Sequence, residues 1–201
     1  MQHINSSKSA VKRLLKTAKK ELGYKEKSRD AWERDPECLE KKSVGIGFDN
    51  YTKYGRDMHS IQPSNMDFPA YWCDSFVDWC FVKAFGEAPA KALLGGFDDY
   101  TVNSAELYKT RKLWAEPGER PEPGYQVFFR NSERICHTGI VIKATEKKLY
   151  TIEGNTYKEK KKEEQESIHG GAVACKSYAL SDQRIAGYGK PPYDYFDKGE
   201  R

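Results

Sequence analysis

The chain has 201 residues, of which 38% are hydrophobic, 32% charged and 13% aromatic, and its net charge is +4. This length and composition fit one globular domain, which we expect to span residues 1–201. The aromatic content argues against wholesale disorder, and the composition excludes collagen-like, coiled-coil and disulfide-scaffold proteins. No stretch reaches the roughly 18 consecutive apolar residues that a membrane span requires, so we expect no span.

The first 22 residues predict a basic amphipathic helix. Apolar residues recur at helical spacing from Val11 to Leu22, and Gly23 follows as a natural stop. Residues 1–20 also carry six Lys and Arg residues and no acidic residue. We interpret this charge as a solvated helix face, with contact to an anionic polymer or surface as the alternative.

No motif in the chain supports nucleic-acid recognition, so we expect no nucleic-acid partner. The N-terminal segment lacks the apolar core of a secretory signal. That pattern is compatible with a cytoplasmic protein, with release by another route such as cell lysis, or with a leader that has been removed. The localisation therefore stays open.

Residues 23–69 predict a long irregular segment punctuated by Gly and Pro, with one or two helical turns in Asp30–Lys42. A second helix is expected to begin near Cys73 and to end before Gly86, because no Gly or Pro interrupts this run. We expect a third, short helix at Ser104–Leu113.

From Pro117 onward the sequence is typical of strands, with segments rich in β-branched and aromatic residues. The tract 158–166 has four Lys and four Glu residues and predicts a solvated hairpin or loop tip. Helices followed by a sheet at about 117–190 predict the α+β class, with N-terminal helices packed on a C-terminal antiparallel sheet. The expected strands are Tyr125–Arg130, Ile135–Lys143, Leu149–Glu153, Ala172–Leu180 and Arg184–Tyr188.

The five cysteines are an odd number, so at least one is unpaired within the chain. Cys73 is expected in the first turn of a helix, where the free amide groups stabilise a thiolate. The amides of Cys73 and Asp74 could also bind an oxyanion. This pattern indicates a candidate nucleophile; the alternative is a small core residue.

Two predicted strands supply the partners of such a nucleophile. A hairpin turn centred on Thr145 would place His137 directly opposite Glu153. Asn155 would then point to the same face as Glu153, and Cys136 to the other face. An imidazole, a carboxylate and an amide would thus converge. Each residue alone also fits a structural role, and a one-residue slip in register would destroy the arrangement.

The remaining candidates near the proposed nucleophile have structural alternatives. We expect Cys80 to be a core residue. A zinc site that uses Cys73, Cys136 and His137 is disfavoured because adjacent strand residues point apart, and we expect no metal and no cofactor. Tyr71 and Trp72 either line a substrate groove or pack in the core.

Three motifs, in this order, resemble the CHAP family of cysteine, histidine-dependent amidohydrolases and peptidases. They are AYWCDSFVDWC at 70–80, CHTGIVI at 136–142 and TIEGNT at 151–156. GYKEK at 23–27, NYTKYGRD at 50–57 and PGYQVFF at 123–129 resemble the family more loosely, so the resemblance covers roughly residues 10–190.

The chain also departs from the family pattern at two points. Tyr125 stands where such proteins often have Asp after Pro-Gly, which puts a turn contact in doubt. No Asp-x-Asp run precedes Cys73, so the calcium that some relatives bind there is not implied.

The resemblance implies a papain-like fold with the nucleophilic cysteine at a helix N-terminus. It implies Cys73 as the nucleophile, His137 as general base and then general acid, and Glu153, Asn155 or both as the group that orients the imidazole. The implied reaction is hydrolysis of an amide bond in bacterial peptidoglycan through a thioester, as in phage lysins. The implied partner is peptidoglycan or a peptide, met at the bacterial cell wall by a monomer.

Two other functions remain open from the sequence. The first is a wall-binding or interaction module without turnover, for which the basic N-terminal helix is the supporting feature. The second is a papain-like hydrolase that acts on an amide outside the cell wall. The sequence does not distinguish a peptide bridge from the sugar–peptide amide as the bond cleaved.

Overall fold

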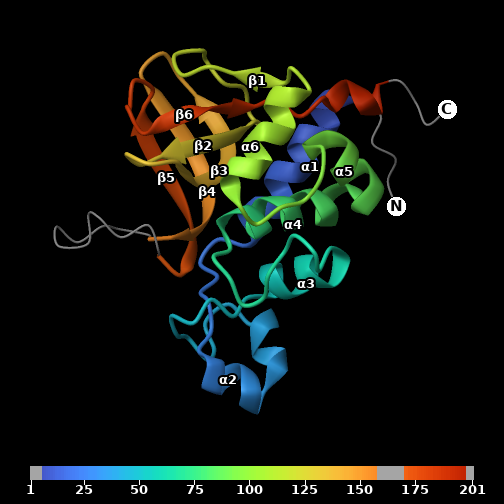
Figure 1. Cartoon of the computed structure of the whole chain (residues 1–201), viewed down its shortest axis with the longest axis vertical. Coiled ribbons are helices and arrows are strands. Elements are labelled where there is room, and N and C mark those ends of the chain that lie inside the picture. The colour runs from blue at the N-terminus through green and yellow to red at the C-terminus, as the bar shows by residue number, and fades with distance from the viewer. Residues whose placement is uncertain (1–5, 158–169, 198–201) are drawn as a thin grey trace.

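The structure is a computed structural model that describes residues 6–157 and 170–197. It combines a helical layer with an antiparallel sheet, so the expected α+β class is confirmed (Figure 1). The helices are α1 (Ser7–Lys20), α2 (Arg29–Arg34), α3 (Lys53–Ile61), α4 (Cys73–Phe85), α5 (Glu87–Leu94) and α6 (Thr101–Thr110), with 3-10 turns η1 (Pro36–Glu40) and η3 (Tyr193–Phe196).

The sheet has six strands in the order β1-β6-β2-β3-β4-β5, and neighbouring strands are antiparallel. The five strands expected from the sequence are all present, with ends that differ by a few residues. The short first strand, which ends just before Pro117, was not expected. The strands are β1 (Trp114–Ala115), β2 (Gln126–Arg130), β3 (Ile135–Ala144), β4 (Lys148–Thr156), β5 (Ala172–Ala179) and β6 (Ile185–Gly189).

The expected basic N-terminal helix is α1. The Ser6 hydroxyl caps its first turn by accepting a hydrogen bond from the Ser9 amide at 3.3 Å. Its apolar stripe of Ala10, Leu14 and Ala18 is fully buried in the main core. Burial of this stripe holds the helix in place, because an isolated helix of this length is marginal in water.

Two helices were missed by the sequence analysis. Gly55, one of the glycines in the segment predicted to be irregular, lies inside α3, where a Cβ atom would lie 3.2 Å from the Phe68 ring. Helix α5 was also not predicted; its Pro89 lies in the first turn, where proline is tolerated. The expected helical turns in Asp30–Lys42 are α2 and η1, and the tract 158–166 lies outside the described residues.

Helix α4 is central to the packing. It lies against β3 and β4 and also contacts α1, α3 and α5. A Cβ atom at Gly154 of β4 would lie 2.5 Å from the Phe76 Cβ and 2.9 Å from Cζ3 of Trp72. Only glycine therefore permits this contact, which brings the beginning of α4 directly against the middle of β4.

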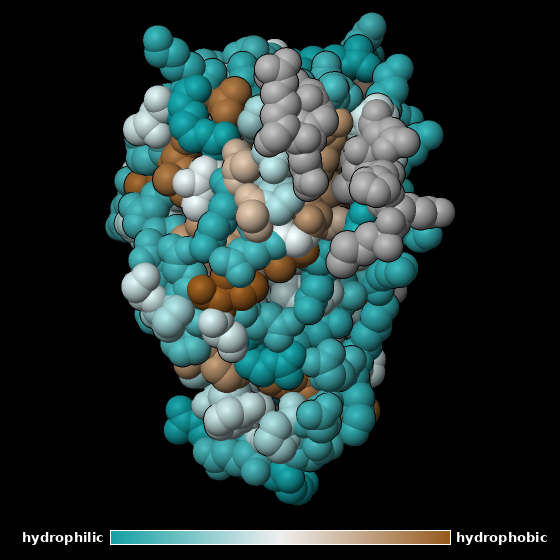
Figure 2. All heavy atoms as spheres, turned by 90° about the vertical axis from the view of Figure 1, so that its right-hand side faces the viewer, coloured by the Kyte–Doolittle hydropathy of each residue, from teal (hydrophilic) through white to brown (hydrophobic). Residues whose placement is uncertain are grey.

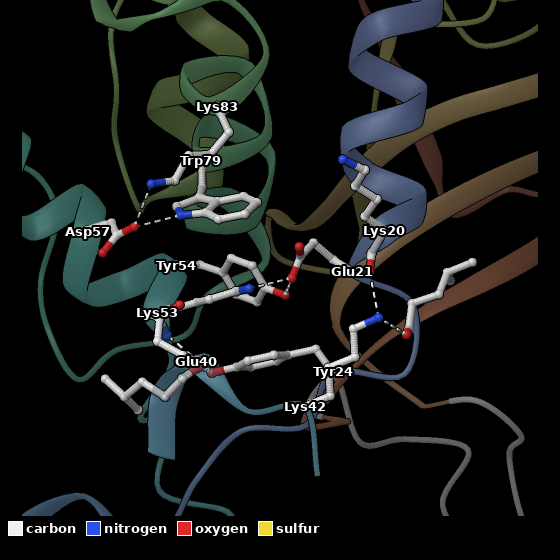
Figure 3. A network of polar contacts seen from close by, with 12 residues as sticks. Lys20, Glu21, Tyr24, Glu40, Lys42, Lys53, Tyr54, Asp57, Trp79 and Lys83 are labelled. Carbon is white, nitrogen blue, oxygen red and sulfur yellow. Dashed lines mark hydrogen bonds and ion pairs between the residues drawn. The ribbon is translucent and has the colours of Figure 1, made fainter. Parts of the chain in front are cut away.

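A buried polar network joins the end of α1 to α3 and α4 (Figure 3). The Lys53 ammonium lies 2.7 Å from Oε2 of Glu21, and the Tyr54 hydroxyl donates to the same oxygen at 2.8 Å. Trp79 of α4 donates to Asp57 of α3 at 2.8 Å. Because the charges are paired, their burial is tolerated, and the contacts fix α3 against the two longer helices.

The face shown in Figure 2 is mostly hydrophilic, with scattered apolar patches. Within the described part of the chain, none of the helices has the length and apolar character needed to cross a membrane.

Candidate active site

Cys73 is the first residue of α4 and is 5% exposed. The first helical hydrogen bond runs from the Phe76 amide to the Trp72 carbonyl, and no side chain caps this end of the helix. The preceding amides of the first turn are therefore not used by the helix itself. The thiol sits beside a group of backbone donors that favours negative charge.

His137 on β3 and Glu153 on β4 form the second part of the site. Nε2 of His137 lies 3.0 Å from Oε2 of Glu153. The Glu153 carboxylate is fully buried, and it also accepts hydrogen bonds from the hydroxyls of Thr151 at 2.5 Å and Tyr178 at 3.1 Å. Three donors thus fix both oxygens of the carboxylate, and the carboxylate in turn fixes the imidazole ring.

The register of the two strands differs from the expected one. Ile140 pairs with Ile152, so Glu153 lies beside Gly139 rather than directly opposite His137. The predicted strand register, which assumed a hairpin turn centred on Thr145, was therefore wrong by two residues. A shift of two preserves the face of the sheet, because side chains alternate with a period of two. Glu153 consequently reaches His137 diagonally, across Gly139.

Cys73 interacts with the other side of the His137 ring. Burial alone would lower the pKa of His137, but hydrogen bonds with Cys73 and Glu153 outweigh it and raise the pKa to about 10. Nδ1 is buried and has no partner of ordinary hydrogen-bond geometry among the described residues. Since Nε2 faces Glu153, Nδ1 is the nitrogen left for the thiol, although the contact does not have the geometry of a standard hydrogen bond. Such contacts commonly tighten only when substrate binds.

Asn155 lies at the end of β4, 2% exposed, with a φ of 51°. The ladder with β5 is irregular between Glu153 and Thr156, which turns the backbone at this point. Oδ1 of Asn155 has no hydrogen-bond partner among the described residues. Nε2 of His137 donates its hydrogen bond to Oε2 of Glu153 instead. The structure therefore brings Glu153, and not Asn155, to the ring nitrogen.

The two aromatic residues before Cys73 differ in exposure. Trp72 is fully buried, donates to Oε2 of Glu26 at 2.7 Å and stacks on Tyr54 at 5.4 Å between ring centroids. Of the two alternatives for Trp72, core packing is the one observed. Tyr71 is 54% exposed and stays a candidate for substrate contact.

All five cysteines are free. Cys80 is fully buried in the main core, as expected, and burial raises the pKa of its thiol well above the usual range. Cys136 is half-buried, and burial raises its pKa despite the nearby His137 ring. Across residues 6–157 and 170–197, no three His, Cys, Asp or Glu side chains are grouped as metal ligands.

Two residues that hold Glu153 were missed by the sequence analysis. Thr151 is two positions before Glu153 on the same strand, so strand alternation alone indicates a shared face. Tyr178 comes from β5, beyond residues 158–169, and no local signal in the sequence connects it to Glu153. Its ring also packs against Phe129, which in turn contacts the His137 ring.

The sequence model of the CHAP domain family matches residues 64–155. This range begins shortly before Cys73 and includes His137, Glu153 and Asn155. No curated protein matches the chain. Residues 64–155, which hold the cysteine, the histidine and the glutamate of the site, are thus the part of the chain that is similar to the CHAP domain family.

Proposed function

We propose that this protein is a thiol-dependent hydrolase that cleaves an amide bond in bacterial peptidoglycan. CHAP domains are generally amidases or peptidases, usually of peptidoglycan. The observation that carries the proposal is the arrangement of three side chains. Cys73 at the start of α4 interacts with a His137 ring whose Nε2 is held by the buried carboxylate of Glu153.

In the proposed reaction, the Cys73 sulfur attacks the carbonyl carbon of the scissile amide, and His137 takes up the thiol proton. The amide groups of the first turn of α4 stabilise the resulting oxyanion. When the tetrahedral intermediate collapses, the C–N bond breaks and His137 donates the proton to the leaving amine. The product is a thioester, which water hydrolyses with His137 again acting as the base.

The roles of the supporting residues follow from their contacts. Glu153 accepts from Nε2 of His137, so that Nδ1 is the nitrogen that faces the thiol and receives its proton, and the carboxylate stabilises the imidazolium that forms. These contacts favour Glu153 over Asn155 as the group that orients the ring. The unpartnered oxygen of Asn155 supports a different role for that residue, in contact with substrate or with an ordered water.

The same arrangement supports a papain-like architecture, in which a cysteine at a helix N-terminus faces a histidine on an antiparallel sheet. We take residues 1–201 as one catalytic domain, because strands β5 and β6, which lie beyond the family match, complete the sheet that carries His137. The activity would be exerted at the bacterial cell wall by a monomer, with peptidoglycan or a peptide as its partner.

A non-catalytic wall-binding module is the alternative that one observation favours. The exposed face of α1 carries Lys8, Lys12, Lys16, Lys19 and Lys20, and the helix has no acidic residue. Under that alternative, Cys73→Ala leaves binding to walls intact, whereas charge reversal at Lys12, Lys16 and Lys20 removes it.

The deciding experiment is digestion of purified cell walls with wild-type protein and with Cys73→Ala, followed by mass spectrometry of the products. We expect loss of turbidity and new amine and carboxyl ends with the wild type only. The masses identify the bond and distinguish a peptide bridge from the sugar–peptide amide. Equal products from both proteins, or cleavage of a control peptide library in place of walls, would refute the proposal.

A further inference from the structure

A buried amide lies directly behind the candidate catalytic pair. Gln126 on β2 is 2% exposed, and its Nε2 donates two hydrogen bonds. One goes to Oδ1 of Asp74 at 3.0 Å, and the other goes to the Thr138 hydroxyl at 3.1 Å. Its Oε1 accepts a third, from the Tyr108 hydroxyl of α6 at 3.1 Å. Both amide hydrogens and the amide oxygen are therefore used.

The two acceptors of this amide are the chain neighbours of the reacting residues. Asp74 follows Cys73 in α4, and Thr138 follows His137 in β3. Asp74 and Thr138 are both fully buried. The Gln126 amide thus connects the helix that carries the thiol to the strand that carries the imidazole, one residue away from each.

The orientation of the Gln126 amide is fixed by its surroundings. The Thr138 hydroxyl donates to the Val127 carbonyl at 2.7 Å, so it meets Gln126 as an acceptor. A flipped amide would direct its oxygen at this acceptor and at the carboxyl group of Asp74. The contact with Thr138 would then not be a hydrogen bond, and buried polar groups left unpaired cost about 1–3 kcal/mol each.

We propose that Gln126 is a positioning residue that sets the distance between Cys73 and His137 by tying Asp74 of α4 to Thr138 of β3. The inference rests on the proposed function for its catalytic consequence. The thiol and Nδ1 are not joined by a hydrogen bond of standard geometry, and no covalent or metal bond among the described residues joins α4 to β3. A misplacement of about 1 Å between reacting groups can lower a rate about 100-fold, so a single buried tie at this point has a large effect.

The test compares Gln126→Leu with Tyr108→Phe in the full chain. Both variants break hydrogen bonds of the same amide and both leave buried polar atoms unpaired, but only Gln126→Leu removes the hydrogen bonds that connect α4 to β3. For Gln126→Leu we expect the maximal rate of wall clearing to fall about 30-fold or more, with the half-saturating wall concentration within about threefold of wild type. Tyr108→Phe should stay within about threefold in both quantities.

A second pair of variants, both at Thr138, keeps the proposal testable if Gln126→Leu does not fold. Thr138→Val removes the hydroxyl and keeps the branched shape, whereas Thr138→Ser keeps the hydroxyl. We expect the maximal rate of wall clearing to fall in Thr138→Val by about as much as in Gln126→Leu. Thr138→Ser should retain most of the wild-type rate. Equal rates for the two Thr138 variants, or a loss in Gln126→Leu no greater than that in Tyr108→Phe, would overturn the inference.

The alkylation rate of Cys73 by iodoacetamide separates this inference from the proposed function, because it requires no wall substrate. We expect the rate to fall about tenfold in Gln126→Leu and in Thr138→Val, and to remain near wild type in Tyr108→Phe and in Thr138→Ser. A wild-type protein that does not clear walls refutes the proposed function alone. Unchanged alkylation in Gln126→Leu and Thr138→Val refutes the positioning role alone.

Discussion

Glu153 contacts His137 from a diagonal position on the neighbouring strand, and the side chain crosses Gly139 to reach Nε2 at 3.0 Å. A Cβ atom at Gly139 would lie 2.5 Å from Cγ of Glu153. The glycine between the histidine and the diagonal carboxylate is therefore part of the geometry of the site, since any side chain there would occupy the path of Glu153.

Gly139→Ala should consequently disrupt the site without removing any polar group. The new methyl must displace Glu153, whose oxygens are held by three hydrogen bonds. We expect kcat on cell walls to fall about 10- to 100-fold. Gly55→Ala in α3 is the matched control, because its Cβ would meet no atom closer than 3.2 Å. Similar activities in the two variants would contradict this account of Gly139.

Glu153→Gln should test the orientation of the imidazole. The amide nitrogen of glutamine would face either Nε2 of His137, which selects the other tautomer, or the Thr151 hydroxyl, which can accept from it. In both cases the negative charge that stabilises the imidazolium is lost. A swapped tautomer of this kind lowers kcat about 100- to 10,000-fold in a catalytic triad. Tyr178→Phe keeps the contact between Glu153 and His137, so it should lower kcat by less than about tenfold. Steady-state rates of wall clearing measure both, and a mild effect of Glu153→Gln would exclude Glu153 as the orienting group.

Cys73 should react with iodoacetamide at pH 6 far faster than Cys38, Cys80 or Cys175. If solvent accessibility alone set the rate, the exposed Cys175 would react faster than the buried Cys73. Burial raises the pKa of the other three thiols, whereas Cys73 faces His137 and the helix N-terminus. Peptide mapping by mass spectrometry reports each rate. His137→Ala should abolish the preference for Cys73, and uniform labelling of the wild type would count against an activated thiol.

Asp74 should make the folded state less stable as the pH rises from about 4 to about 7. Burial raises the pKa of Asp74 to about 7, above the value of about 3.9 in an unfolded chain. Between these values the folded state holds a proton that the unfolded state has released, so stability falls with pH, by at most about 1.4 kcal/mol per unit. Asp74→Asn should flatten this dependence, measured by urea unfolding at pH 5 and pH 7.

Asp57 supplies the control for this measurement. Burial opposes its ionisation, but hydrogen bonds from Arg56 and Trp79 outweigh burial and lower its pKa. Its contribution to stability is present above the unfolded pKa of about 3.9 and is lost only as the pH falls below that. Asp57→Asn should therefore lower stability by the same amount at pH 5 and pH 7. An unchanged slope in Asp74→Asn would show that Asp74 does not carry the effect.

The sequence by itself determined the local elements whose signals lie within one helix or strand. The apolar residues at helical spacing from Val11 to Leu22 predicted α1, and the uninterrupted run from Cys73 to Phe85 predicted α4. Segments rich in β-branched and aromatic residues predicted β2 to β6. An assumed hairpin register placed His137 and Glu153 on one face, and the register observed differs from it by two residues. The three motifs around Cys73, His137 and Glu153 indicated the family before any geometry was known.

Only the tertiary structure decided which of these residues meet. The strand register depends on packing between strands, and a glycine at position 139 lets Glu153 approach diagonally. Tyr178 and Gln126 reach the site from strands distant in sequence, and Trp72 is buried because α3 and Glu26 cover it. Local sequence patterns fix the conformation of a segment, but contacts between distant segments arise only when buried groups must fill space and satisfy one another's hydrogen bonds.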